Sequence, residues 1–122
     1  MSDKRLKLGR RGEELAARYL QNLGYSILKN NFRCYYGEID LIGQEGNTLA
    51  FIEVKTRSSL AFGSPAAAVT PGKQRKIFQV AQYYLSQHPC NNDIRFDVVS
   101  VLVSPHTQPE IELIRNAFDF SD

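Results

Sequence analysis

Apolar residues recur three or four positions apart in two stretches of the chain, which predicts two amphipathic helices. The first covers residues 8–23 and stops at Gly24, a residue typical of helix ends. The second covers residues 71–87, because Thr70 is a good N-cap and Pro71 suits the first helical position. Each helix has one apolar face that must pack against another element.

Strand-forming residues occupy most of the remaining chain. A turn-rich tetrapeptide at 44–47 joins two of these segments and predicts a β-hairpin. A loop at 58–69 leads into the second helix and would border a substrate groove or form a dimer contact. The predicted strands cover residues 25–34, 37–42, 49–57, 94–103 and 110–114. This order, α-β-β-β-α-β-(β), predicts an α/β fold with a mixed central β-sheet flanked by helices.

Three carboxylates and one lysine fall on the predicted hairpin. Because strand side chains alternate between faces, Glu38 and Asp40 would share one face of the first hairpin strand, opposite the apolar positions 39 and 41. Glu53 and Lys55 would likewise share a face of the second strand. Pairing of the two strands brings these polar ends together, whereas a one-residue slip in register would separate them.

Carboxylates in this arrangement suit Mg²⁺, which binds one or two carboxylates and keeps several waters. Asp40 and Glu53 are the expected ligands, and Lys55 would orient or deprotonate the attacking water or hold a phosphate oxygen. The alternative is an ion-pair cluster on a solvated sheet face, which would stabilise the fold little. The apolar run 49–52 favours a metal, because charges on a buried strand are rare unless they are paired or metal-bound.

Length and composition are those of one soluble domain. The chain has 122 residues, of which 43% are hydrophobic and 23% charged, so we expect a single domain with residues 1–7 as a flexible basic tail. No apolar run approaches a membrane span, and no apolar segment of a secretory signal follows the basic N-terminus. Cys34 and Cys90 lack metal-ligand spacing, which favours a reducing, cytoplasmic location. No Gly-rich nucleotide loop is present, so no nucleotide cofactor is expected.

The net charge of +2 is distributed unevenly along the chain. Residues 1–34 carry eight Lys or Arg against three acids, and residues 55–76 carry five against none. Basic segments on both sides of a carboxylate cluster are what a nucleic-acid-cleaving site needs, although a solvated helix face is the alternative for each single residue. The candidate nucleic-acid contacts are Arg10, Arg11, Tyr36, Arg57 and Lys73. Tyr36 is included because its ring would lie at the mouth of the site.

Asp40, followed thirteen residues later by Glu53-Val54-Lys55, resembles the D…(D/E)xK signature of the restriction-endonuclease-like nucleases. Further motifs accompany it at Gly9–Glu13, Gly37–Ile42, Phe51–Arg57, Lys73-Gln74 and Arg95–Asp97. Together, over residues 7–118, they resemble the YraN-like family of small bacterial proteins with this nuclease fold. More distantly, the chain is similar to archaeal Holliday-junction resolvases, which place a glutamate on the first helix; Glu13 takes that position.

The resemblance implies roles for further residues. Glu13 would support the metal or its water, and Glu38 would be an additional ligand; for Glu13 an ordinary helix-surface charge is the alternative. In this superfamily a Gln or Lys on the second helix often completes the active site. Gln74 is therefore a catalytic candidate and Lys73 a substrate-orienting one.

The predicted function is endonucleolytic cleavage of DNA, branched or flapped as for resolvases, with Mg²⁺ or Mn²⁺ as cofactor. DNA is the expected partner, and a homodimer is a further possibility. Two other functions remain open: a non-catalytic accessory protein that binds nucleic acid or a partner on the nuclease fold, and an assembly factor whose charges form a structural network. The complete acidic set together with Lys55 favours the enzyme.

Overall fold

The computed structural model describes residues 3–58 and 69–119. Their element order is α-β-β-β-α-β-β, which confirms the predicted mixed α/β fold. The elements are α1 (Asp3–Asn22), β1 (Ser26–Cys34), β2 (Gly37–Glu45), β3 (Thr48–Arg57), α2 (Pro71–Gln87), β4 (Asp93–Leu102) and β5 (Glu110–Ile114). Most of the loop predicted at 58–69 lies outside the described residues.

The helix ends differ in how well they were anticipated. Thr70 caps α2 as predicted, because its hydroxyl oxygen accepts the N–H of Lys73 at 3.2 Å. At the other end of the chain, α1 begins at Asp3, so residues 3–7, expected in a flexible tail, continue the helix. The segment contains no Gly or Pro before Gly9, and Lys, Arg and Leu are good helix formers.

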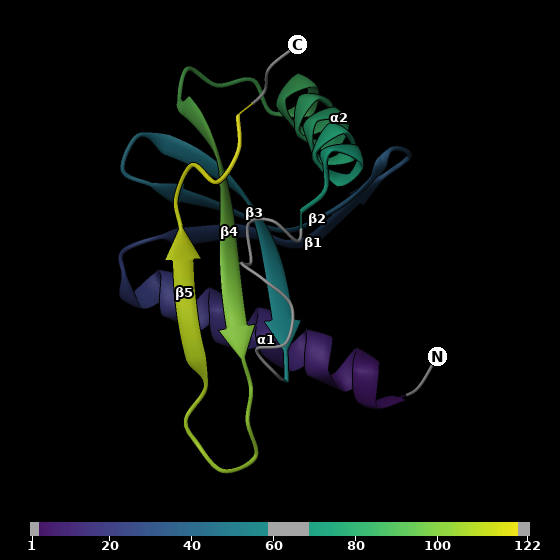
Figure 1. Cartoon of the computed structure of the whole chain (residues 1–122). Coiled ribbons are helices and arrows are strands. Elements are labelled where there is room, and N and C mark those ends of the chain that lie inside the picture. Colours follow the sequence, from purple (N-terminus) through teal and green to yellow (C-terminus); the bar gives the residue numbers. More distant parts are fainter. Residues whose placement is uncertain (1–2, 59–68, 120–122) are drawn as a thin grey trace.

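The five strands form one sheet in the order β1-β2-β3-β4-β5 (Figure 1). Strands β3 and β4 are parallel and the other neighbours antiparallel, so α2 is the crossover between β3 and β4. Helix α1 covers one face of the sheet and α2 the other. No helix among the described residues is long and apolar enough to cross a membrane.

Two apolar clusters hold the central strand in place. On the α2 face, Phe51 stacks on Phe96, which in turn meets Phe78 of α2 edge to face. On the α1 face, Leu20 packs with Ile52 and the neighbouring strand residues. Both faces of β3 are therefore covered along its first half, which rigidly positions the residues that follow.

Side-chain alternation holds in β3 but not in β2. Ile39 packs on the α2 face, whereas Leu41, two residues later, packs on the α1 face. The prediction that positions 39 and 41 share a face is therefore wrong. Pairing of β2 with β3 extends only from Leu41 to Glu45, so β2 leaves the partner strand before Leu41. Opposite this point in β1, Asn31 has φ 52, a left-handed conformation that also interrupts the regular strand geometry.

A second polar cluster lies away from the hairpin carboxylates, around Asp97. Its side chain is 0% exposed and accepts hydrogen bonds from Tyr25 Oη at 2.9 Å and from the Asn116 N–H at 2.9 Å. Arg95 pairs with it at 2.9 Å and also reaches Glu45 at 2.7 Å. Asp97 is therefore a structural residue that pairs with Arg95.

Candidate active site

Asp40 and Glu53 meet where β2 separates from β3. Asp40 is 9% and Glu53 5% exposed. Asp40 Oδ2 accepts the Val54 N–H at 2.8 Å and so replaces the strand pairing that β2 has given up. The charge of Glu53 acts directly on the Asp40 carboxyl group. The structure thus brings together the two residues that the sequence predicted as the main metal ligands.

Burial raises the pKa of Asp40 far above that of an ordinary carboxyl, and the neighbouring charge of Glu53 raises it further. The Val54 N–H opposes the shift but does not cancel it. Two carboxylates this close in a buried site stay ionised together only beside positive charge, so the pair needs a proton, a metal ion or a neighbouring lysine to balance it. This electrostatic state is the main chemical feature of the site.

Two lysines from different elements point at Glu53. Lys73 Nζ, in the first turn of α2, lies 2.8 Å from Glu53 Oε2, and Lys55 Nζ, two residues along β3, lies 3.6 Å from the same oxygen. Burial lowers the pKa of Lys73, but the hydrogen bond to Glu53 and the charges of Glu53 and Asp40 outweigh it and raise the pKa overall. Lys73 is therefore a fixed cation.

Glu13 reaches the same region from α1. Burial raises the pKa of its carboxyl, and the charges of Glu38 and Glu53 raise it further, against a hydrogen bond with Asn31 that lowers it. A small cavity of about 200 Å³ beside it is lined by Glu13, Arg10 and Asn31 among others. Glu13 is thus part of the electrostatic neighbourhood of Glu53 and has open space next to it.

Glu38 lies at the rim of the site. Its side chain is 43% exposed, and its carboxylate pairs with Arg33 at 2.6 Å. Among the residues that the structure describes, no three or more Asp, Glu, His or Cys side chains gather as they would around a metal ion. Of the four carboxylates expected at the metal, Asp40 and Glu53 are adjacent, while Glu13 and Glu38 stand farther out.

The pair nevertheless fits a divalent ion of the magnesium type. Mg²⁺ is commonly held by only one or two carboxylates and completes its shell with water and substrate oxygens. A pair of buried carboxyl groups supplies the hard oxygen donors that such an ion prefers. Asp40 and Glu53 are the residues that would hold the ion.

The structure distinguishes between the two neighbouring candidates on α2. The Gln74 amide donates to the carbonyl of Val69 at 3.0 Å, a contact that holds the segment leading into the helix. Lys73, one residue earlier, is the one that contacts Glu53. Consecutive helical residues point about 100° apart, so only one of the two faces the carboxylates.

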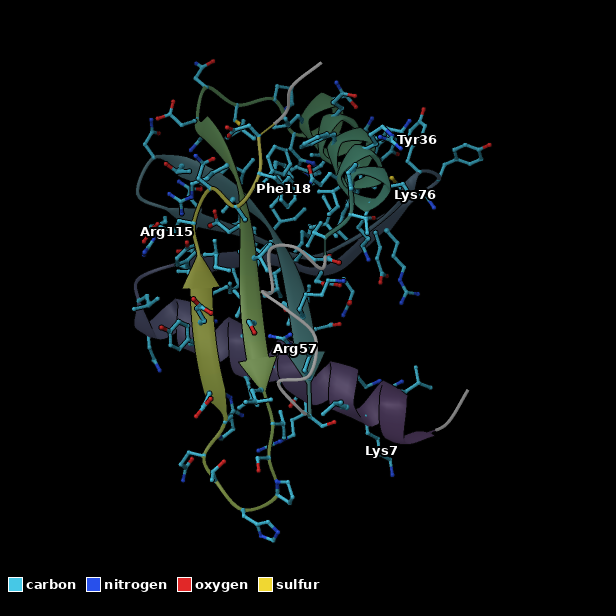
Figure 2. All side chains as sticks on the ribbon, viewed as in Figure 1. Lys7, Tyr36, Arg57, Lys76, Arg115 and Phe118 are labelled. Carbon is cyan, nitrogen blue, oxygen red and sulfur yellow. The ribbon has the colours of Figure 1, made fainter. Side chains whose placement is uncertain are left out.

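The remaining nucleic-acid candidates come from separate elements. Arg10 and Arg11 are exposed on α1, and Tyr36 is 46% exposed at the turn between β1 and β2. Arg57 is partly buried at the end of β3 (Figure 2). Tyr83, which no sequence signal singled out, contacts Tyr36 at a ring distance of 6.4 Å.

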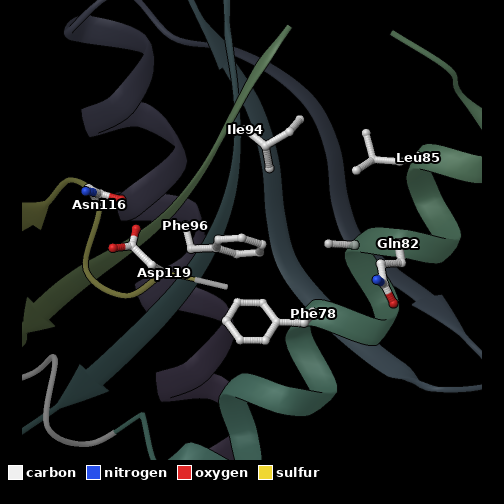
Figure 3. Close-up of a pocket in the computed structure, with 8 residues that line it drawn as sticks. Phe78, Gln82, Leu85, Ile94, Phe96, Asn116 and Asp119 are labelled. Atoms are coloured by element: carbon white, nitrogen blue, oxygen red, sulfur yellow. The ribbon is translucent and has the colours of Figure 1, made fainter. Parts of the chain in front are cut away.

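A larger hollow lies elsewhere on the molecule. It has a volume of about 600 Å³ and is lined by Phe78, Leu85, Ile94 and Phe96 among others (Figure 3). Ile94 stands four residues before Val98, the β4 neighbour of Glu53, so this hollow is at the opposite end of the strand. Its lining is mainly apolar and contains neither the carboxylate pair nor a lysine, so it is not the reacting centre.

In metal-free solution the free energy of unfolding is expected to fall as the pH rises from about 4 through the raised pKa of Asp40. The folded carboxyl holds its proton more tightly than the unfolded one, so this stabilisation is complete below the ordinary pKa and lost above the raised one. Each pKa unit between the folded and the unfolded state corresponds to about 1.4 kcal/mol in the free energy of unfolding. Asp40→Asn, which keeps an acceptor for Val54, should flatten the profile.

Denaturant titrations across this pH range, in the presence of a chelator, measure the effect. Adding Mg²⁺ should restore stability at high pH in the wild type but not in Asp40→Asn. Asp93→Asn, at an exposed carboxylate on β4, is the control and should leave the slope unchanged. Identical slopes for wild type and Asp40→Asn would show that the carboxyl pair is not under electrostatic strain.

Close packing of α1 against β3 at Gly12 fixes the position of the neighbouring residue, Glu13. A Cβ at Gly12 would lie 1.8 Å from Thr56 Oγ1 and 2.7 Å from Thr56 Cβ, so α1 approaches β3 closely there. Gly12→Ala should therefore destabilise the protein by about 1–3 kcal/mol, because the helix must move. Gly9→Ala is the matched control: its Cβ meets nothing within 4 Å, and helix propensity predicts a gain of up to about 1 kcal/mol. Thermal unfolding of both variants checks the opposite signs, and a stabilised Gly12→Ala would contradict the packing.

Fold and site together define a small mixed α/β protein with a buried carboxylate pair and two lysines at one end of its central strands. The chain belongs to the uncharacterised protein family UPF0102, whose family model matches residues 12–101. This confirms the YraN-like assignment.

Relatives in this family match nearly the whole chain. A UPF0102 protein of Geotalea daltonii is 50% identical over 115 residues, which is 93% of this chain and 91% of the relative. One from Caldicellulosiruptor saccharolyticus is 48% identical over 114 residues, 92% of this chain and 97% of the relative. These names state no substrate, activity or partner.

Proposed function

We propose that the protein is a divalent-metal-dependent endonuclease that hydrolyses phosphodiester bonds in DNA. The observation that carries this proposal is the buried Asp40–Glu53 pair with Lys55 and Lys73 directed at it. Carboxylates that hold a metal, with cations beside them for the phosphate, are the groups that such hydrolysis needs. The spacing of Asp40, Glu53 and Lys55 also resembles the D…(D/E)xK signature.

Each residue of the site has a proposed part in the reaction. Bound Mg²⁺ or Mn²⁺ would supply Lewis-acid activation of the phosphate and of a water. Asp40 and Glu53 hold the ion, with Asp40 oriented by the Val54 N–H. Lys55 orients the attacking water or takes its proton, and Lys73, a fixed cation, binds a phosphate oxygen.

Further residues act around this centre. Glu13 positions a water of the metal shell from α1, and Glu38 adds negative charge at the rim. Arg10, Arg11 and Arg57 supply positive charge for the DNA backbone. The resemblance to resolvases suggests branched or flapped DNA as the substrate. The proposed location is the cytoplasm. The proposed assembly is a homodimer, which would hold two DNA strands. The described cysteines, Cys34 and Cys90, are free thiols, which suits a reducing compartment.

One observation favours a second function. Glu53 is already paired with both lysines, and three or more potential metal ligands do not gather among the described residues. A protein with its acidic centre neutralised in this way can bind nucleic acid without cutting it. The second candidate is therefore a non-catalytic nucleic-acid-binding accessory protein on the same fold.

Cleavage of end-labelled duplex, single-stranded, flapped and four-way DNA with Mg²⁺ or Mn²⁺ tests the proposal. Glu53→Gln should lower the rate by about 10²-fold or more, because the metal loses a charged ligand. Glu14→Gln is the matched control at an exposed carboxylate of α1 and should leave the rate unchanged. Salt-sensitive binding without cleavage of any substrate would establish the accessory protein instead.

A further inference from the structure

An exposed group of aromatic rings lies beside α2. Tyr36 is 46% and Tyr83 39% exposed, yet their ring centroids are 6.4 Å apart. Tyr35, 95% exposed, meets Tyr36 edge to face at 5.4 Å, and Phe32 lies 6.4 Å from Tyr83 on the strand side. We call Tyr36 and Tyr83 the tyrosine platform. Exposed apolar rings that gather in this way usually mark a contact surface.

The tyrosine platform connects to the candidate active site through two adjoining hollows on α2. The first, about 340 Å³, is lined by Tyr36, Tyr83, Gln79, Gln82 and Ser86. The second, about 580 Å³, shares Gln79 and adds Thr70, Gly72, Lys73, Arg75 and Lys76. Lys73 in turn lies 2.8 Å from Glu53. Figure 2 shows Tyr36 and Lys76 on the same side of the molecule, next to α2.

Helix α2 offers this groove positive charge and hydrogen-bonding groups but no acid. Its seventeen residues contain no Asp or Glu, and its bases, Lys73, Arg75 and Lys76, lie in its first two turns, where Lys73 contacts Glu53. Amide and hydroxyl groups follow, and then the rings. Lys76, Gln79 and Tyr83 recur at helical spacing and so share one face. From Lys73 to Tyr83 the helix rises about 15 Å, a span of a few nucleotides.

We propose that this groove seats an unpaired nucleic-acid strand, with a base stacked on the tyrosine platform and its phosphates beside Lys73 and Lys76. The proposal rests on the proposed function, since the groove starts at the scissile site. The proposal specifies the substrate class as nucleic acid with a single-stranded or frayed segment next to the cleavage point. Bases inside a duplex have both faces covered by their neighbours and cannot stack on a protein ring, whereas unpaired bases can. Because α2 lines the groove with bases and no acids, the groove favours a polyanion such as a nucleic-acid strand over a protein segment with few acidic residues.

Binding can be measured apart from cleavage. In Asp40→Asn protein with a chelator, fluorescence anisotropy compares a labelled single strand with a duplex of the same length. Adding Tyr36→Ala or Tyr83→Ala should weaken single-strand binding about 5- to 100-fold and duplex binding much less. Tyr→Phe changes at both positions should keep the affinity, because the ring face remains. Leu23→Ala, at an exposed apolar residue at the end of α1, is the control and should change nothing.

Three outcomes would overturn the proposal. The first is single-strand binding that is the same in both alanine variants and in the parent. The second is polyphosphate binding that weakens as much as oligonucleotide binding, and the third is duplex binding that weakens as much as single-strand binding. In the last two cases the rings support the surface instead of stacking on bases. Tyr36→Leu and Tyr83→Leu, which keep an apolar side chain, replace any alanine variant that fails to fold.

Failure of the two proposals can be told apart. A wild-type protein that cuts nothing but binds single strands through the tyrosines would retain the platform and refute the endonuclease. The opposite result would be cleavage that depends on Glu53, is unchanged by substitution of either tyrosine and shows no preference for unpaired DNA. It would support the endonuclease and refute the tyrosine platform as a strand-binding site.

Discussion

Lys55→Met is expected to lower the rate of phosphodiester cleavage by about 10²- to 10⁴-fold with little change in stability or DNA affinity. The Lys55 side chain is 25% exposed, so it faces the site opening while its amine stays 3.6 Å from Glu53 Oε2. Methionine keeps a similar length and apolar stem but removes the charge and the proton. The ion pair with Glu53 is lost as well, but Lys73 still pairs with that carboxylate at 2.8 Å. The interactions with the reacting water or phosphate are lost with it, and these matter most in the transition state.

Lys73→Met offers a comparison within the same site. Lys73 contacts Glu53 more closely, at 2.8 Å, but is a fixed cation. The Lys73→Met substitution should therefore weaken DNA binding, and it should lower the cleavage rate less than Lys55→Met does. Single-turnover rates at saturating protein, with anisotropy for affinity, separate the two effects. Lys29→Met, at an exposed lysine of β1, controls for the loss of one charge. If Lys55→Met cuts as fast as Lys29→Met, Lys55 has no part in the chemistry.

Asp97→Ala is expected to lower the free energy of unfolding by about 3–5 kcal/mol. The side chain is 0% exposed and accepts hydrogen bonds from Tyr25, Arg95 and Asn116. Its removal leaves the Arg95 guanidinium and the Tyr25 hydroxyl without their main acceptor inside the protein. Unpaired buried charges and donors cost much more than the original interaction contributed.

Chemical denaturation measures this loss. Glu45 will retain part of the network, because Arg95 and Arg115 both pair with it, at 2.7 and 2.6 Å. Asp97→Asn should therefore cost less than Asp97→Ala. Asp93→Ala, at an exposed acid on the same strand, should stay within about 0.5 kcal/mol of wild type. A loss below about 1 kcal/mol for Asp97→Ala would mean that water or Glu45 replaces the carboxylate.

Local sequence determined the elements and much of the candidate site. The Thr70-Pro71 pair set the start of α2, because capping depends on residues within one turn. The turn predicted at 44–47 does join β2 to β3, although it is confined to Gly46-Asn47, and period-two alternation put Glu53 and Lys55 on one face of β3. These features depend on neighbours within a few residues, so a single sequence is enough to read them.

Only the tertiary structure decided how these groups meet. The separation of β2 from β3 before Leu41, and the bond from the Val54 N–H to Asp40 in its place, are contacts between strands that no local pattern specifies. The choice of Lys73 over Gln74 as the partner of Glu53 depends on the rotation of α2 over the sheet. Tyr83 joins Tyr36 across 47 residues of chain, a contact that no local pattern contains. Sequence periodicity assigns a residue to one face of its helix or strand. The residue that it contacts on another element depends on how elements distant in the sequence pack together.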